Sequence, residues 1–251
     1  MRTPMVAGNW KLNGSRESAV ALAREVASVT VAGVDVVVCP VSVHFADVSA
    51  ALKDTTVKLG AQNACAEESG AFTGEVSSSM LAEFGCEYVI IGHSERRSLF
   101  GDSNESCATR HKAVVAAGLT PIFCVGEMLE DREAGNTMAV VESQLQPVFD
   151  TCGDNGFAAA VVAYEPVWAI GTGKTATPEQ AQDVHAGIRK FIAARDQQTA
   201  QTLRILYGGS VNPGNAAELI GKPDIDGGLI GGAALKSADF LAICQAAAAQ
   251  V

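Results

Sequence analysis

Eight short apolar segments of strand length recur along this chain of 251 residues, at intervals of about 20 to 45 residues. Most of them are continuous apolar runs rather than alternating ones. Such runs are typical of strands that are buried on both faces of a parallel sheet. The segments cover residues 5–9, 36–39, 57–61, 88–92, 120–125, 158–164, 204–208 and 227–231.

Helical patterns fill the intervals between these segments. Gly118 follows one of them, and glycine is favoured just past the C-terminus of a helix. Thr177 followed by Pro178 is a strong helix start, because threonine caps the N-terminus and proline suits the first turn. The sequence predicts helices over residues 15–29, 104–117, 177–197, 213–219 and 237–250.

Eight strand–helix units without a linker match a closed (β/α)8 barrel in size and order. The composition agrees, because 48% of the residues are hydrophobic, which is ample for a large core. An open doubly wound sheet could contain the same units and is the alternative. In both folds the carboxyl ends of the parallel strands share one face, where functional residues gather. We therefore predict an α/β protein with a single domain over residues 1–251.

The charge of the chain argues against two classes of partner. The net charge is −10, and no cluster of lysine and arginine occurs, so we expect no binding to nucleic acid or to anionic membranes. No apolar run approaches 18 residues, and the first residues do not resemble a signal peptide. We expect a soluble, cytoplasmic protein.

The cysteines point to a reducing compartment. There are seven, an odd number, and none forms a CxxC pair, which argues against a disulfide framework or a zinc ribbon. We interpret most of them as small buried hydrophobic residues. The four histidines do not show the spacing of metal ligands, so we predict no metal site.

One segment joins a carboxylate to an apolar loop. An apolar run ends at Glu165, and Pro166 then disfavours helical backbone at that residue. The next residues, 167–170, form an apolar loop tip, which needs something to cover because loops normally lie in water. This arrangement indicates an acid–base group at the carboxyl end of a buried strand, with a flap attached to it.

Other strand ends carry chemically useful residues. Asn9 and Lys11 follow the first strand, and His93 follows the fourth. Each has a structural interpretation as well: His93 could be a core residue, Lys11 a solvated surface charge, and Asn9 a partner for turn backbone. The case for a site rests on their joint occurrence with Glu165 on one face.

Two glycine-rich turns follow the seventh and eighth strands. Ser210 comes after two glycines, and Gly231 and Gly232 precede a short helical stretch. Backbone N–H groups at a helix N-terminus bind phosphate, and barrels of this kind often build a phosphate site from these two loops. The alternative is that the glycines only permit tight corners.

A nucleotide site is not indicated. Gly173 and Lys174 resemble the end of a P-loop, but the glycine required five positions earlier is Trp168. No dinucleotide-binding glycine motif follows a strand. We therefore predict no nucleotide or dinucleotide site.

Several motifs together resemble the triosephosphate isomerase family. They occur in order along nearly the whole chain without a large insertion, and the combination is highly specific. The motifs are NWKLNG at residues 9–14, QN at 62–63, GAFTGE at 70–75, GHSERR at 92–97, YEPVWAIGTG at 164–173 and YGGSV at 207–211.

The resemblance implies a (β/α)8 TIM barrel that interconverts dihydroxyacetone phosphate and D-glyceraldehyde 3-phosphate through an enediolate, in glycolysis and gluconeogenesis, without metal or cofactor. It implies that Glu165 is the base, with a pKa raised by a dry pocket. Neutral His93 would polarise the carbonyl. Lys11 would supply positive charge, and Asn9 a second polar contact.

The resemblance also assigns supporting residues. Glu95 and Ser94 would lie behind the reacting groups, with Glu95 as a partner of Lys11, and Cys124 would pack behind the base. The backbone N–H groups that hold the phosphate would be those of Gly171, Ser210, Gly231 and Gly232. The lid would consist of Pro166, Val167, Trp168, Ala169, Ile170, Gly171, Thr172, Gly173 and Lys174.

A homodimer is implied as well. Residues 65–76 resemble the interface loop of the family, in which Phe72, Thr73, Gly74 and Glu75 would reach a neighbouring subunit near its Asn9 and Lys11. The structural alternative is a mobile surface loop. Two functional alternatives also stay open: a Schiff-base aldolase that uses Lys11, and a barrel that binds ligands without turnover.

Overall fold

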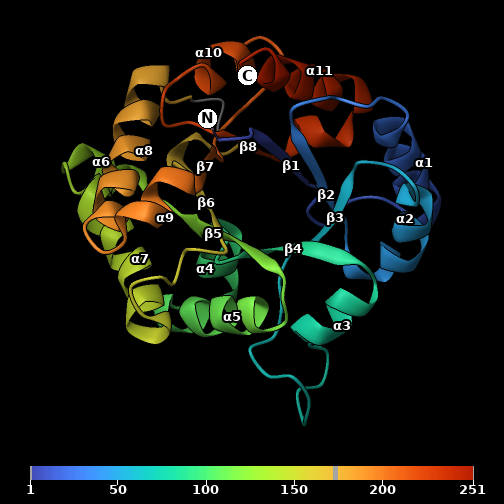
Figure 1. Ribbon diagram of the computed structural model, residues 1–251, viewed down its shortest axis with the longest axis horizontal. Coiled ribbons are helices and arrows are strands. Elements are labelled where there is room, and N and C mark those ends of the chain that lie inside the picture. The colour runs from blue at the N-terminus through green and yellow to red at the C-terminus, as the bar shows by residue number, and fades with distance from the viewer. Residues whose placement is uncertain (1, 172–174, 251) are drawn as a thin grey trace.

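In the computed structural model, which describes residues 2–171 and 175–250, eight parallel strands form a closed barrel (Figure 1). Each strand pairs with the next along the chain, and β1 pairs with β8 to close the barrel. This confirms the predicted (β/α)8 TIM barrel, and the open-sheet alternative is wrong. The strands are β1 (Met5–Asn9), β2 (Asp35–Cys39), β3 (Lys58–Ala61), β4 (Cys86–Ile91), β5 (Thr120–Val125), β6 (Val161–Tyr164), β7 (Arg204–Tyr207) and β8 (Gly227–Ile230).

Helices surround the barrel as an outer ring (Figure 1). The α-helices are α1 (Arg16–Ala27), α2 (Phe45–Leu52), α3 (Ser78–Glu83), α4 (Ser94–Phe100), α5 (Asn104–Ala116), α6 (Leu129–Glu133), α7 (Thr137–Cys152), α8 (Pro178–Ala193), α9 (Gln197–Thr202), α10 (Ala216–Ile220) and α11 (Ser237–Ala248). Short 3-10 helices are η1 (Ser42–His44), η2 (Val167–Ala169) and η3 (Gly232–Leu235). None of the described helices is long and apolar enough to cross a membrane.

Local capping explains several boundaries. Thr177 caps α8 and forms a capping box with Gln180, as the Thr-Pro start predicted. The helix predicted over 177–197 ends earlier, at Ala193, and a separate helix, α9, begins at Gln197, where Asp196 accepts hydrogen bonds from the N–H groups of Gln198 and Thr199.

Two other predicted elements begin later than expected. Strand β6 starts at Val161 rather than at residue 158, because residues 158–160 form turns in which Ala158 N–H donates to the carbonyl of Asn155. Helix α10 starts at Ala216, because the side chain of Asn212 accepts a hydrogen bond from Gly214 N–H and holds a turn.

The core has two layers, which explains the continuous apolar runs. Alternate strand residues fill the barrel interior, for example Met5 and Ala7, while Val6 faces the surrounding helices. Both faces of each strand are therefore buried, as parallel sheets covered by helices require. The seven cysteines are unpaired, and six of them are buried.

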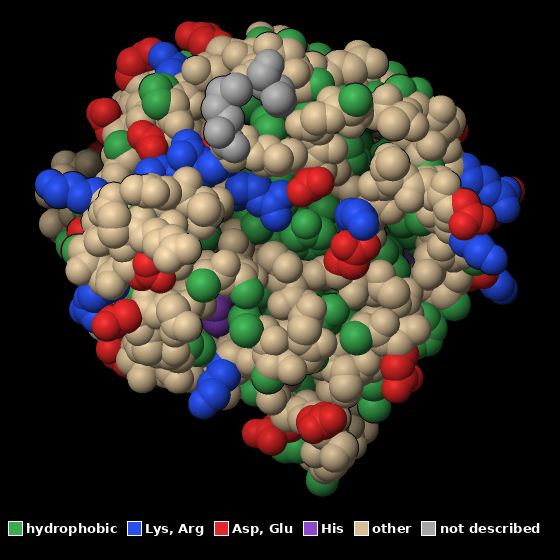
Figure 2. Space-filling model, viewed as in Figure 1, with side chains coloured by type: hydrophobic (Ala, Val, Ile, Leu, Met, Phe, Trp, Pro, Cys, Tyr) green, Lys and Arg blue, Asp and Glu red, His purple; other side chains and the backbone are tan. Residues whose placement is uncertain are grey.

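Two features mark the surface. The segment between β3 and α3 projects from the barrel as a long loop (Figure 1), and acidic and apolar side chains lie at its tip (Figure 2). On the face shown in Figure 2, basic and acidic side chains are interspersed rather than segregated. Ion pairs between described residues include Arg204 with Asp35 and Arg189 with Asp224.

Candidate active site

The carboxyl ends of the strands bring the predicted residues to one cavity of about 250 Å³. Asn9 ends β1, and Lys11 follows it. His93 lies two residues after the end of β4, and Glu165 directly follows β6. The lining also includes Ile170, Gly171, Ser210, Gly231 and Gly232. Residues that lie far apart in the chain therefore form one site, because parallel strands end on the same face.

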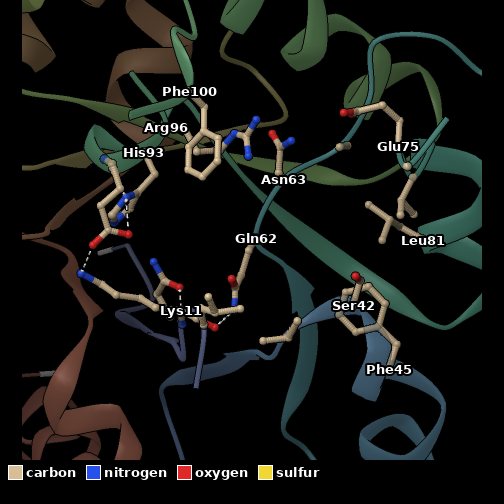
Figure 3. A pocket seen from close by; sticks show the side chains of 17 residues that line it. Lys11, Ser42, Phe45, Gln62, Asn63, Glu75, Leu81, His93, Arg96 and Phe100 are labelled. Carbon is tan, nitrogen blue, oxygen red and sulfur yellow. Dashed lines mark hydrogen bonds and ion pairs between the residues drawn. The ribbon is translucent and has the colours of Figure 1, made fainter. Parts of the chain in front are cut away.

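Lys11 is held in an unusual conformation. Its φ angle is +51°, in the left-handed region that is costly for residues other than glycine. Lys11 N–H donates to Asn9 Oδ1 at 3.0 Å, and its carbonyl accepts from Gln62 Nε2 at 2.8 Å. Its Nζ forms an ion pair with Glu95 Oε1 at 2.6 Å (Figure 3). These contacts keep the ammonium group beside the cavity.

His93 caps the N-terminus of α4. Its Nδ1 accepts a hydrogen bond from the backbone N–H of Glu95 at 3.2 Å. Because Nδ1 is an acceptor, the neutral imidazole carries its proton on Nε2. His93 Nε2 lies 2.9 Å from Glu165 Oε1, so this N–H donates to the carboxylate. A helix N-terminus thus selects the tautomer whose donor faces the cavity.

Glu165 is fixed both at its side chain and at its backbone. Its second oxygen, Oε2, accepts from Ser94 N–H at 2.9 Å, and its own N–H donates to the carbonyl of Val125 at 2.7 Å. A Cβ at Gly208 would lie 2.8 Å from Glu165 Cγ, so glycine is needed there. The carboxylate is 2% exposed and has little room to move.

The charges of His93 and Glu165 are coupled. Burial raises the pKa of Glu165, but His93 and the Ser94 N–H lower it by more, so this pKa lies below its ordinary value. Burial lowers the pKa of His93, but the Glu165 and Glu95 carboxylates together raise it by more, so this pKa lies above its ordinary value. The sequence-based expectation of a raised Glu165 pKa took account of burial alone; the pairing reverses its direction in this arrangement.

Cys124 lies behind the base, inside the barrel. Burial, together with the nearby Glu165 carboxylate, raises the pKa of its thiol well above the ordinary value. The group is therefore a neutral thiol, and it packs in the barrel interior with residues such as Ile122.

The opposite wall of the cavity is built from glycine-rich turns. Gly231 caps η3, which begins at Gly232, and a Cβ at Gly231 would lie 3.4 Å from Lys11 Cε. Gly171 has a φ angle of +67°, which favours glycine. The N–H groups at the start of a helix have no partner within it and can bind an anion.

The predicted lid begins directly after Glu165. Pro166 leads into η2, which contains Val167, Trp168 and Ala169, and Ile170 reaches the cavity. Thr172, Gly173 and Lys174 lie outside the described residues. The apolar tip covers part of the protein, as expected, because Ala169 is fully buried and Trp168 packs against the core.

Glu127, a residue for which the sequence predicted no role, anchors the lid. This carboxylate is fully buried, and its Oε1 accepts from Trp168 Nε1 at 3.0 Å and from the Tyr164 hydroxyl at 3.1 Å. Its carbonyl also accepts from Val167 N–H at 3.1 Å. The available signal was its position two residues after the fifth strand, at the same end of the barrel as the other site residues.

The four predicted interface residues do not line the Glu165 cavity. They lie on the projecting loop, where Phe72 is 47% exposed. Gly74 and Glu75 line a second cavity of about 370 Å³ that also contacts Asn9 and Lys11 (Figure 3). Two of its lining residues, Leu12 and Phe100, expose large apolar side chains, and Val43 and Leu99, which neighbour lining residues in the chain, are exposed as well.

The described residues do not form a metal-binding site. Within the part of the chain that the structure describes, no three or more histidine, cysteine, aspartate and glutamate side chains are grouped so that they could hold a metal ion.

Comparison with known proteins agrees with the geometry. The triosephosphate isomerase family model matches residues 4–247. The triosephosphate isomerase of Herminiimonas arsenicoxydans is 55% identical over 98% of this chain and 100% of its own length. The triosephosphate isomerase of Pseudomonas putida (strain W619) is 54% identical over 98% of this chain and 99% of its own length. That of Xanthomonas campestris pv. campestris (strain 8004) is also 54% identical, over 99% of this chain and 100% of its own length. The chain therefore belongs to the triosephosphate isomerase family.

Proposed function

We propose that the protein interconverts dihydroxyacetone phosphate and D-glyceraldehyde 3-phosphate, the reaction of its family, as a step of glycolysis and gluconeogenesis. The observation that carries this proposal is the placement of Glu165 and His93 2.9 Å apart in a cavity whose opposite wall contains Gly171, Ser210, Gly231 and Gly232. A base and a neutral hydrogen-bond donor thus face a wall suited to a phosphate group.

Glu165 removes the proton from the carbon next to the carbonyl and returns it to the neighbouring carbon. A substrate that enters between Glu165 and His93 separates the two groups. Separation removes the interaction that lowers the pKa of Glu165, and burial then raises that pKa. The base becomes stronger at the moment when it faces the substrate.

His93 supplies the donor for the substrate oxygens. With Nδ1 occupied by Glu95 N–H, the Nε2–H group points toward the site and can polarise the carbonyl. As charge develops on one oxygen, the same nitrogen can pass protons between the two oxygens of the enediolate. Neutral imidazole suits this role because its proton affinity is close to that of the intermediate.

Lys11 and Asn9 link the reacting end to the phosphate end. The Lys11 side chain lies beside Gly231, and its ammonium group is fixed by Glu95. A fixed positive charge there stabilises the enediolate and the phosphate dianion, and it costs no reorganisation during the reaction. Asn9 holds the Lys11 backbone and adds a polar group to the cavity wall.

The lid, from Pro166 through Lys174, couples phosphate binding to closure. Gly171 belongs to both the lid and the cavity lining, so a phosphate bound there favours the closed loop. Closure excludes water, which strengthens electrostatic interactions and protects an intermediate that could otherwise lose phosphate. Binding energy from a group that does not react is in this way used for the chemical step.

The protein functions as an isologous homodimer. The loop with Phe72, Thr73, Gly74 and Glu75 would enter the second cavity of the partner, close to its Asn9 and Lys11. Support comes from the exposed apolar side chains around that cavity, which a partner would cover. Unpaired, mostly buried cysteines fit the cytoplasm. The pairing of β1 with β8 supports a single domain over residues 1–251.

A coupled assay for the formation of glyceraldehyde 3-phosphate tests the activity, and wild-type protein without turnover would refute it. Borohydride trapping in the presence of substrate tests the aldolase alternative. The ion pair between Lys11 and Glu95 argues against that alternative, because a Schiff base forms from an uncharged amine. A covalent adduct on Lys11 would overturn the isomerase proposal.

A further inference from the structure

We propose that Gln144 is a positioning residue for the Glu165 base, acting through the backbone of Gly126; this inference rests on the proposed function. Gln144 lies on α7, is nearly buried, and pairs its side-chain amide with both polar groups of one residue. Gly126 N–H donates to Gln144 Oε1 at 2.7 Å, and Gln144 Nε2 donates to the Gly126 carbonyl at 2.9 Å.

The amide of Gln144 replaces a missing strand. The pairing of β4 with β5 ends at Ile91 and Phe123, because the chain then turns toward α4. Beyond that point, side chains form the hydrogen bonds that a neighbouring strand would otherwise make with the backbone of β5. Arg97 donates to the carbonyl of Cys124 at 3.1 Å, and the side chain of Gln144 accepts from Gly126 N–H. Backbone groups left without partners at such an edge are costly when they are buried.

Gly126 is in direct contact with the base residue. A Cβ at Gly126 would lie 1.7 Å from the carbonyl oxygen of Glu165, so the two backbones touch and no side chain fits between them. On either side of Gly126, the Val125 carbonyl accepts from Glu165 N–H and the Glu127 carbonyl accepts from Val167 N–H. The position of residues 125–127 therefore sets the position of both the base and the first residues of the lid.

Packing does not fix this segment on its other side. A cavity of about 360 Å³ borders Gly126, Gln144, Glu165 and Val167. Since side chains do not fill that space, the hydrogen bonds to Gln144 restrain Gly126 on this side. A displacement of about 1 Å at a reacting group is enough to lower a rate about 100-fold.

Gln144→Met tests the proposal, because methionine keeps the length of the side chain and removes both hydrogen bonds. We expect kcat to fall by about tenfold to 100-fold. We expect KM and the inhibition constant of inorganic phosphate to stay within about threefold of the wild type, since the phosphate wall is untouched. Gln146→Met is the matched control: Gln146 lies on the same helix, but its side chain bonds to Asp150 and Arg195 rather than to Gly126.

Gln144→Glu separates positioning from a merely structural role. A protonated carboxyl group presents one donor and one acceptor, as the amide does, whereas a carboxylate repels the Gly126 carbonyl. The ratio of kcat between this variant and the wild type should approach one at low pH and fall as pH rises. Arg97, Asp131 and Glu165 also border the cavity, but they are common to both proteins, so the ratio isolates residue 144.

Three results would overturn the proposal. The first is a Gln144→Met variant with kcat within twofold of the wild type. The second is a loss that the unfolded fraction explains, measured by circular dichroism under assay conditions. The third is a kcat ratio for Gln144→Glu that does not change with pH. This result would overturn the proposal even if Gln144→Met does not fold. An inactive wild type would instead refute the proposed function.

Discussion

His93 Nε2 and Glu165 Oε1 lie 2.9 Å apart, and both side chains are almost completely buried. This contact places the donor and the base of the proposed reaction against each other. It also shifts the pKa of each group: His93, with Ser94 N–H and Lys11, lowers that of Glu165, and Glu165, with Glu95, raises that of His93, in each case against the effect of burial. A substrate that separates them changes the pKa of both.

Shortening the base tests its placement. Glu165→Asp withdraws the carboxylate by about 1 Å or more, and we expect kcat to fall by about 100-fold or more while KM changes by only a few-fold. The reason is that the phosphate contacts at Ser210, Gly231 and Gly232 are left in place. Steady-state kinetics in the coupled assay measure both constants. An unchanged kcat would remove Glu165 from the role of base.

Replacing His93 tests whether this residue causes the depressed pKa of Glu165. In His93→Gln, the imidazole that lowers the pKa of Glu165 is lost while burial stays, so this pKa should rise from its depressed value. A titration of the Glu165 carboxyl carbon followed by NMR measures this change. We expect the same direction when an enediolate-like phosphate ligand binds to the wild type. A pKa that falls in either case would contradict the coupling.

Two buried histidines should weaken the protein in acid. Burial lowers the pKa of His111 and of His185 to about 4. Since the unfolded chain binds these protons near pH 6.5, stability is retained above that pH and is lost as pH falls toward 4, by up to about 3 kcal/mol for each histidine. Urea unfolding at several pH values should show a shallower loss below pH 6.5 in His111→Gln than in the wild type. An equal slope would indicate that His111 does not contribute.

The projecting loop should control the oligomeric state. Phe72→Asp combined with Thr73→Arg places charges where a partner would bury the loop, and we expect a monomer with low activity, seen by analytical ultracentrifugation and the coupled assay. Val29→Asp is the control, because this partly exposed valine follows α1 on the outer ring, away from the loop. A fully active monomer would refute the interface.

The folding pattern could be predicted from the sequence to a large extent. The eight apolar runs are continuous because both faces of each strand are buried, and this property is visible locally. The same holds for the cap at Thr177, where the signal lies within four residues. Boundaries were less accurate near Asp196, where α8 has already ended at Ala193 and the Asp196 side chain caps a separate helix.

The set of candidate site residues also followed from the sequence. Parallel strands end on one face whatever their side chains are, so Asn9, Lys11, His93 and Glu165 were expected to lie close together, and the structure brings them to one cavity. Their family motifs are short and contiguous, which makes them recognisable without coordinates.

Only the tertiary structure decided how these residues are held and charged. Glu127 lies 41 positions from Trp168, and Gln144 lies 18 positions from Gly126, and neither separation corresponds to a local pattern. The depressed pKa of Glu165 likewise depends on the distance to His93, which burial and composition do not predict. The sequence determined which groups reach the end of the barrel, because the local apolar pattern locates each strand and therefore the residues that follow it. Their contacts, and therefore their protonation and precise positions, depend on long-range packing, because hydrogen bonds and charge interactions act over a few ångströms between segments that the chain keeps far apart.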